Sequence, residues 1–220
     1  MTGADDLRRA PLPVDLDRLL HDLRGPLNAA VMHLEVLKRL QSEDPATRAS
    51  LQSIHQELER LTAMLPLAFA VCALEMGTPR RLLLRGVVES AIDEGTRKRV
   101  RVDPGPWPEV EGDERLLVLA VRQLIVNALE AASDESEVRV AVERTEADAV
   151  AVAIHDAGSG FKTRNPNAVV RLMGSTKGGH LGIGLLVAQR IARLHGGRLT
   201  FETAADGGGV VRLVLAGRPS

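Results

Sequence analysis

The stretch RQLIVNALEAA, residues 122–132, is the part of the sequence that decides the fold of the larger half of the chain. It lies in a segment, residues 113–132, whose apolar residues recur at helical spacing. One asparagine, Asn127, lies in this helix, whose other residues are apolar on the core side. A buried amide needs a polar partner. It either caps a neighbouring loop or serves a ligand, and the apolar surroundings favour the ligand.

Short β-rich runs alternate with predicted helices on both sides of this stretch. The predicted strands are residues 99–104, 136–143 and 149–156, and the predicted helices are residues 81–94, 113–132 and 184–195. Residues 197–217 follow the pattern of a hairpin with a glycine-rich turn. The sequence therefore predicts an α/β domain over residues 77–220, with one sheet covered by helices.

The run HDAGSGF, residues 155–161, follows directly on a predicted strand. Its pattern of Asp156, Gly158 and Gly160 is an ordinary turn when it occurs alone. The glycines also allow a bound molecule to approach the backbone closely. A carboxylate at that place is a candidate acceptor for a ligand's amino group.

A second glycine-rich run, STKGGHLGIG, precedes the last predicted helix. Gly182 and Gly184 stand at its start, where free backbone N–H groups attract phosphate anions. Lys177 could add a positive charge. The glycine pair alone is a weak signal, and nothing here fits the P-loop or dinucleotide-binding patterns.

The first 76 residues follow a different pattern, with two helical seams of apolar residues. The first seam is Leu16, Leu20, Leu23, Leu27, Ala30, Leu34 and Leu37, and the second is Leu51, Ile54, Leu58, Leu61 and Leu65. Asp44 and Pro45 mark the start of the second helix. One hairpin cannot enclose both seams, so we expect a homodimer in which two hairpins form a four-helix bundle.

The first helix carries HDLRGPLN, residues 21–28. The helical spacing places His21 on the exposed side, together with Gly25 and Asn28. Pro26 inside a helix costs about 3 kcal/mol. Such a cost beside the exposed histidine indicates that His21 has a function. A neutral imidazole is a nucleophile near pH 7, and Asp22 could hold its tautomer or take up its proton.

Together these motifs resemble the sensor histidine kinases of two-component systems. By this resemblance residues 21–28 are the H-box, with His21 as phosphoacceptor and Asp22 as its acid/base partner. The stretch around Asn127 is similar to the N-box of GHKL ATPases, whose asparagine ligates Mg²⁺ at the nucleotide phosphates. Asp156 would accept from the adenine amino group, whereas Lys177, Gly182 and Gly184 would face the phosphates of ATP.

The resemblance extends from about residue 13 to residue 216, with departures near its end. The usual phenylalanine-rich box is replaced by VVRLMG, and His180 and Leu181 stand where a glycine and a threonine are usual. These changes affect the ATP lid, roughly residues 161–181. Gln123 stands where gyrase-like ATPases have a glutamate that activates water, and an amide cannot act as that base.

The resemblance implies a fold and a function. The fold is an α+β chain, with a dimerization and phosphotransfer hairpin over residues 1–76 and an ATP-binding domain over residues 77–220. The function is ATP-dependent, Mg²⁺-dependent autophosphorylation of His21, followed by transfer to an aspartate of a response-regulator receiver domain. A separate sensor protein is a possible partner.

Two alternatives stay open at this point. In the first, the chain is a phosphorelay intermediary whose second domain is a degenerate docking module. In the second, it is an anti-sigma serine kinase, which would have no use for the H-box helix.

Composition and charge narrow the classes further. A formal net charge of −1 with interspersed charges, and only 2% aromatic residues, disfavour a nucleic-acid partner. The single cysteine, Cys72, fits a reducing compartment. The most apolar run, residues 61–76, is shorter than a bilayer requires. We therefore expect a cytoplasmic protein without direct membrane insertion.

Overall fold

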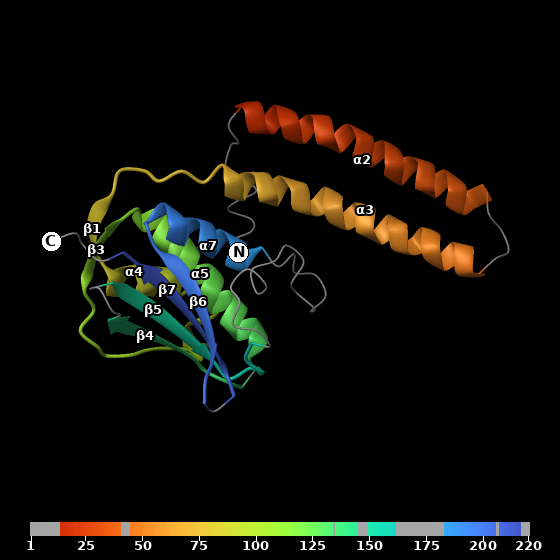
Figure 1. Ribbon diagram of the computed structural model, residues 1–220. Coiled ribbons are helices and arrows are strands. Elements are labelled where there is room, and N and C mark those ends of the chain that lie inside the picture. Colours follow the sequence, from red (N-terminus) through yellow and green to blue (C-terminus); the bar gives the residue numbers. More distant parts are fainter. Residues whose placement is uncertain are drawn as a thin grey trace. The chain divides into compact units, whose positions relative to one another are not determined.

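The computed structural model describes residues 14–40, 45–133, 135–144, 149–161, 183–205 and 207–216 (Figure 1). The chain divides into two compact units, residues 1–73 and residues 74–220. The sequence placed the boundary slightly later, after residue 76. No described helix is both long and apolar enough to cross a membrane.

The first unit consists of two long helices that lie side by side, α2 (Val14–Leu40) and α3 (Pro45–Cys72) (Figure 1). Helix α3 begins at Pro45, as the sequence predicts, whereas Asp44 lies outside the described residues. Helix α2 continues without a break through Gly25 and Pro26. The predicted weak turn is therefore still helical.

The pairing of α2 with α3 buries only part of the two apolar seams. In α2 one heptad position, Leu20, Leu27 and Leu34, is buried or half-buried. The alternate position contains Leu23 and Leu37, which are 38% and 47% exposed. Helix α3 repeats this division, because Leu51, Leu58 and Leu65 are half-buried while Ile54 and Leu61 are 50% and 39% exposed. Each helix thus retains an apolar stripe that the hairpin itself does not cover.

The second unit is built on a five-stranded sheet in the order β2-β4-β5-β7-β6. Its strands are β2 (Val100–Val102), β4 (Val138–Arg144), β5 (Val150–Asp156), β6 (Arg198–Thr203) and β7 (Gly209–Leu215). Strand β2 runs parallel to β4, and the other neighbours are antiparallel. The strands predicted from the β-rich runs and the final hairpin are confirmed.

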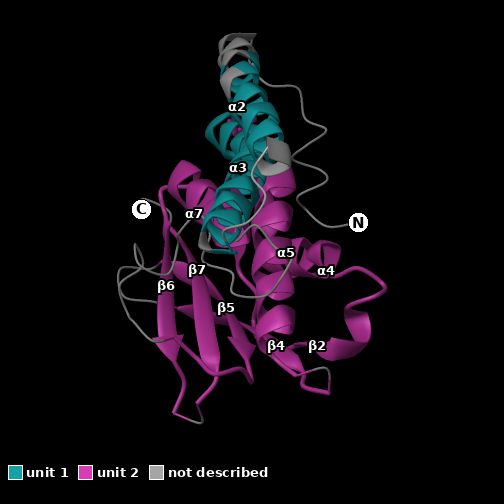
Figure 2. Cartoon of the chain, turned by 90° about the vertical axis from the view of Figure 1, so that its right-hand side faces the viewer, with its two compact units in different colours: residues 1–73 teal, residues 74–220 magenta. Residues whose placement is uncertain are grey.

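Helices cover one face of this sheet, as Figure 2 shows for α4 (Leu84–Ala91) and α5 (Glu114–Ala131). Helix α5 contacts β4, β5 and β7, and α7 (Gly184–Leu194) contacts β6 and β7. Between helices and sheet lies an apolar core that includes Leu116, Val121, Ile154, Ile191 and Leu213, each fully buried. The predicted domain with one sheet covered by helices is confirmed in this form.

A small second sheet was missed by the sequence analysis. Strand β1 (Arg80–Leu83) pairs antiparallel with β3 (Glu109–Gly112), and a 3₁₀ turn (Arg97–Arg99) precedes β2. The predicted helix over residues 81–94 was therefore wrong at both ends, since only Leu84–Ala91 is helical. The partner strand follows the proline-rich PGPWP, which resembles a loop, so the pairing that makes β1 extended left no local signal.

The face of the sheet away from the helices is covered by long charged side chains. Arg212 of β7 donates from Nε to Glu143 Oε2 of β4 at 2.7 Å, and from Nη1 to Glu202 Oε2 of β6 at 2.7 Å. Strand β5 lies between β4 and β7, and the register sets Ala153 opposite Arg212 and Ala151 opposite Glu143. These alanines are small enough for the charged side chains to meet above them.

We expect Ala153→Leu to lower the free energy of unfolding by about 1–3 kcal/mol, because a larger side chain would fill the space beneath the Arg212 pair. Urea unfolding measures the change. Ala157→Leu, at an exposed turn position, is the matched control and should stay within about 0.5 kcal/mol of wild type. Equal stability of the two variants would contradict this account of the alanines.

Candidate functional site

Helix α5 positions two amide side chains against the start of α7. Gln123 and Asn127 are one helical turn apart and therefore lie on the same side of α5. A Cβ atom at Gly184 would lie 2.9 Å from Gln123 Oε1 and 3.0 Å from Asn127 Nδ2. A glycine at the first position of α7 leaves room for both side chains, so the structure brings the predicted residues Asn127 and Gly184 together.

The Asn127 amide is the polar group of this site that lacks a partner. Its Nδ2 atom is buried and has no hydrogen-bond partner among the described residues. A buried unsatisfied amide costs about 1–3 kcal/mol. Amide oxygens are hard ligands suited to Mg²⁺, which usually takes only one or two protein oxygens and completes its shell with phosphates and water. The unpartnered nitrogen can therefore donate to a phosphate oxygen, and the oxygen of the same amide can ligate a metal ion bound to that phosphate.

The turn after β5 holds the Asp156 carboxylate by one oxygen. Asp156 Oδ1 accepts from the backbone N–H of Gly158 at 2.8 Å and of Gly209 at 3.2 Å. Within the described part of the chain, Oδ2 accepts no hydrogen bond. A Cβ atom at Gly209 would lie 2.5 Å from Oδ2. The carboxylate is thus oriented by two donors and keeps one oxygen for a ligand's N–H.

Gly160 shapes the same turn. Its φ of +67° lies in the left-handed region, and a Cβ atom there would lie 2.5 Å from Thr203 Cγ2. Thr203 Oγ1 accepts from Phe161 N at 2.9 Å and donates to Phe161 O at 3.1 Å. The end of β6 therefore fixes the chain immediately after the turn.

Both parts of the site depend on α5. A Cβ atom at Gly158 would lie 2.7 Å from the backbone oxygen of Ala131, the last residue of α5. Asn127 precedes Ala131 by one turn of the same helix. The Asp156 turn and the Asn127 amide are therefore neighbours along the C-terminal end of α5.

The remaining predicted site residues lie elsewhere or outside the described part. His21 is exposed on α2, together with Gly25 and Asn28, as predicted. The side chain of Asp22 and the whole of Lys177 and Gly182 lie outside the described residues. The same holds for His180, Leu181 and almost all of the segment identified as a lid.

The sequence analysis missed Gly209 and Thr203. The run ADGGGVV was interpreted only as a hairpin turn, although its last glycine donates to Asp156. The register of β5 and β7 sets Gly209 opposite Asp156, and a strand pairing across 53 residues is invisible in local sequence. The three consecutive glycines 207–209 are more than a hairpin turn requires, and this excess could have indicated a role for Gly209.

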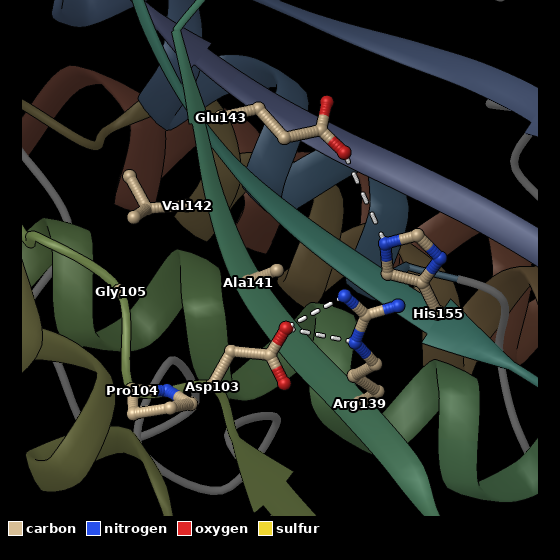
Figure 3. Close-up of a pocket in the computed structure, with 8 residues that line it drawn as sticks. All are labelled: Asp103, Pro104, Gly105, Arg139, Ala141, Val142, Glu143 and His155. Atoms are coloured by element: carbon tan, nitrogen blue, oxygen red, sulfur yellow. Dashed lines mark hydrogen bonds and ion pairs between the residues drawn. The ribbon is translucent and has the colours of Figure 1, made fainter.

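A separate pocket of about 440 Å³ lies on the charged face of the sheet (Figure 3). Asp103 Oδ2 accepts from Arg139 Nε and Nη2 at 2.8 and 2.7 Å on one side, and His155 Nε2 lies 4.0 Å from Glu143 Oε1 on the other. Burial lowers the pKa of His155, and the nearby Arg139 lowers it further. Strand alternation directs His155 away from the helices, so this pocket is distinct from the site along α5.

The comparisons with known proteins identify the class of the second unit. Residues 112–218 match the family described as histidine kinase-, DNA gyrase B-, and HSP90-like ATPase. This part of the chain is similar to that family and has the fold of its ATPase domains. The match contains both halves of the site, the α5 amide and the Asp156 turn.

The chain as a whole is similar to sensor histidine kinases, which confirms the resemblance. It is 29% identical to sensor protein BasS of Escherichia coli K12 over 222 residues, covering 93% of this chain and 60% of BasS. The mycobacterial sensor histidine kinase MprB is 25% identical with a TM-score of 0.53, covering 64% of this chain and 98% of the MprB chain. Full-length ShkA in complex with AMPPNP covers 96% of this chain at 17% identity and a TM-score of 0.58, a likeness of fold.

We expect Gly184→Ala to weaken binding of ATP at least tenfold, because the added methyl group would push Gln123 and Asn127 out of place. Isothermal calorimetry in the presence of magnesium measures the affinity. Gly86→Ala is the matched control, since a Cβ atom there meets nothing within 4 Å and alanine favours the helix by about 1 kcal/mol. Unchanged binding in Gly184→Ala would remove the start of α7 from the site.

Proposed function

We propose that the chain is the kinase core of a sensor histidine kinase, with a phosphotransfer unit before residue 74 and an ATP-binding unit after it. The observation that carries this proposal is that the Asn127 amide, Gly184 and the Asp156 carboxylate lie together along α5. Only one oxygen of that carboxylate is bonded within the described residues. The exposed His21 supplies the acceptor. Similarity to sensor kinases over most of the chain supports it.

ATP would be held by residues from both halves of the site. Asp156 Oδ2 accepts from the adenine amino group, while Gly158 and Gly160 let the base approach the backbone. The backbone N–H groups at the start of α7 face the phosphates, with Gly182 and Lys177 as further candidates. Asn127 would ligate Mg²⁺, which would neutralise charge on the phosphates.

The histidine acts as the nucleophile. An unprotonated ring nitrogen of His21 forms a bond to the γ-phosphorus as the bond from that phosphorus to the bridging oxygen of ADP breaks. The other ring nitrogen loses its proton to Asp22. Phosphoryl transfer of this kind depends mostly on positioning and charge neutralisation, so few reactive side chains are required.

The second step passes the phosphoryl group to an aspartate on a receiver domain. An exposed acceptor suits this step, because a partner protein must reach it. Gln123 supports transfer to a side chain over hydrolysis, since an amide cannot take a proton from water. Its place against Gly184 puts it beside the phosphate end of the site, where a glutamate would act.

A second copy of the chain would complete the hairpin. The exposed stripe of Leu23, Leu37, Ile54 and Leu61 repeats at heptad spacing on both helices. Two such hairpins bury one another's stripes in a four-helix bundle. In this proposal the half-buried heptad positions hold the two helices of one chain together. The exposed heptad positions pair that hairpin with the hairpin of a second chain.

We expect Ile54→Glu to raise the dimer dissociation constant at least tenfold, because a charge would be buried between the hairpins. Sedimentation equilibrium measures the constant. Gln52→Glu adds the same charge at an exposed polar position of α3 and should leave it within twofold. A wild-type protein that is monomeric at high micromolar concentration would count against the bundle.

We expect His21→Gln to abolish incorporation of label from γ-labelled ATP, because glutamine has no nucleophilic nitrogen. In wild type the label should survive alkali and be lost in acid, as a phosphoramidate is. His33→Gln, exposed on the same helix, is the matched control and should label normally.

Two results would redirect the proposal. Full labelling of His21→Gln would move the acceptor to another residue. A wild type that binds no nucleotide at millimolar concentration, yet accepts phosphate on His21 from a phosphorylated protein, would favour the phosphorelay alternative.

A further inference from the structure

The segment that follows α3 is tied to the second unit almost as soon as the helix ends. Helix α3 ends at Cys72, and Ala73 N still donates to Phe69 O at 2.9 Å. The next backbone oxygen, that of Leu74, accepts from Arg190 Nη2 of α7 at 3.4 Å. Gly77 N donates to Asp113 Oδ2 at 2.8 Å. These two bonds join residues 74–77 to helices of the second unit.

Asp113 holds Gly77 with a charged group. It is the N-cap of α5, where its Oδ1 accepts from Leu116 N at 3.2 Å. Burial raises the pKa of Asp113, but the hydrogen bonds from Gly77 and Leu116 outweigh that effect and hold the pKa below its usual value. The carboxylate is therefore ionised at neutral pH. Hydrogen bonds to charged acceptors are roughly twice as strong as neutral ones.

The same residue joins the start of α5 to the end of α7. Asp113 N donates to His195 Nε2 at 3.0 Å, and this requires the proton of the ring to be on Nδ1, which lies 2.8 Å from Ile191 O. A Cβ atom at Gly112 would lie 2.8 Å from His195 Cδ2, so a glycine must precede Asp113. The attachment point of Gly77 is thus fixed to both helices.

These two helices are also the ones that form the nucleotide site. Helix α5 carries Asn127, and α7 begins at Gly184. The segment after α3 is therefore bonded to the rigid elements that hold the phosphates, rather than to a loop at the edge of the domain.

We propose that Asp113 is a positioning residue for phosphoryl transfer to His21, because its bond to Gly77 fixes the segment after α3 to the helices that bind ATP. Arg190 adds a second, longer bond to the same segment. The inference rests on the proposed kinase function. A freely rotating connection would lower the effective concentration of the bound nucleotide at His21, without changing the affinity for ATP.

One substitution separates this role from ordinary helix capping. Asp113→Asn keeps an oxygen for Leu116 N, and asparagine is as good an N-cap as aspartate. Its amide nitrogen donates and cannot accept from Gly77 N. Glu114→Gln removes the same charge from an exposed position in the same helical turn and is the matched control.

The experiment uses the full chain with labelled ATP and magnesium. In Asp113→Asn the autophosphorylation rate at saturating ATP should fall at least fivefold, while KM for ATP stays within twofold. Hydrogen exchange at the Gly77 amide should accelerate at least tenfold. Glu114→Gln should match wild type in all three. Arg190→Met should lower the rate by a smaller factor, and Arg193→Met, at an exposed position, is its control. If Asp113→Asn does not fold, Arg190→Met is used as the test in its place.

Three outcomes would overturn the inference. Unchanged hydrogen exchange at Gly77 in Asp113→Asn would show that the Asp113–Gly77 bond does not protect this amide. Faster exchange with an unchanged autophosphorylation rate would show that the bond has no part in phosphoryl transfer. A rise in KM that accounts for the whole loss would make Asp113 part of the nucleotide site instead. A wild type that does not label itself would overturn the kinase function and with it the positioning role. Faster exchange at Gly77 in Asp113→Asn would still establish the bond, so the two failures are distinguishable.

Discussion

Helix α5 must satisfy three neighbours at once, and the rest of the second unit is arranged around that requirement. One side of the helix is packed on the sheet through fully buried residues such as Leu116 and Val121. Its flanks contact α4 and α7. Where α5 meets the start of α7, it presents the amides Gln123 and Asn127 beside the glycine that begins α7. Because the surrounding core is closely packed, these amides have little freedom to move.

The two units are incomplete in different ways. The hairpin buries one heptad position of each helix and leaves the other in contact with water, so its unmet requirement is apolar surface. The second unit has a packed apolar core, and among its described residues the buried Asn127 nitrogen lacks a hydrogen-bond partner. An exposed apolar stripe suits burial against another protein surface, whereas unpaired polar groups suit a polar ligand. Along the chain, the hairpin with its exposed apolar stripe therefore precedes the unit with the unpaired Asn127 nitrogen.

The sequence predicted most of the fold and about half of the site. Periodicity identified α2, α3, α5 and α7 and the main strands, because each buries a continuous face. It failed at β1 and β3, whose extended shape comes from pairing with each other. Asn127 was predicted because a polar residue on an apolar helix face leaves a local signal, and Asp156 because a glycine pattern follows a predicted strand and resembles a family motif. Gly209, Thr203 and Asp113 were not, since their partners are distant along the chain and only the register of the strands and the start of α5 bring them together.

The lone amide of Asn127 also places a limit on how stable the protein can be. Among the described residues Asn127 Nδ2 has no partner; a buried nitrogen of this kind raises the free energy of the folded state, and an apolar side chain of similar size would remove the penalty. Selection for thermal stability alone would therefore replace this residue. Its presence marks a compromise between durability and activity, in which the empty protein stays less stable so that its ligand can complete it.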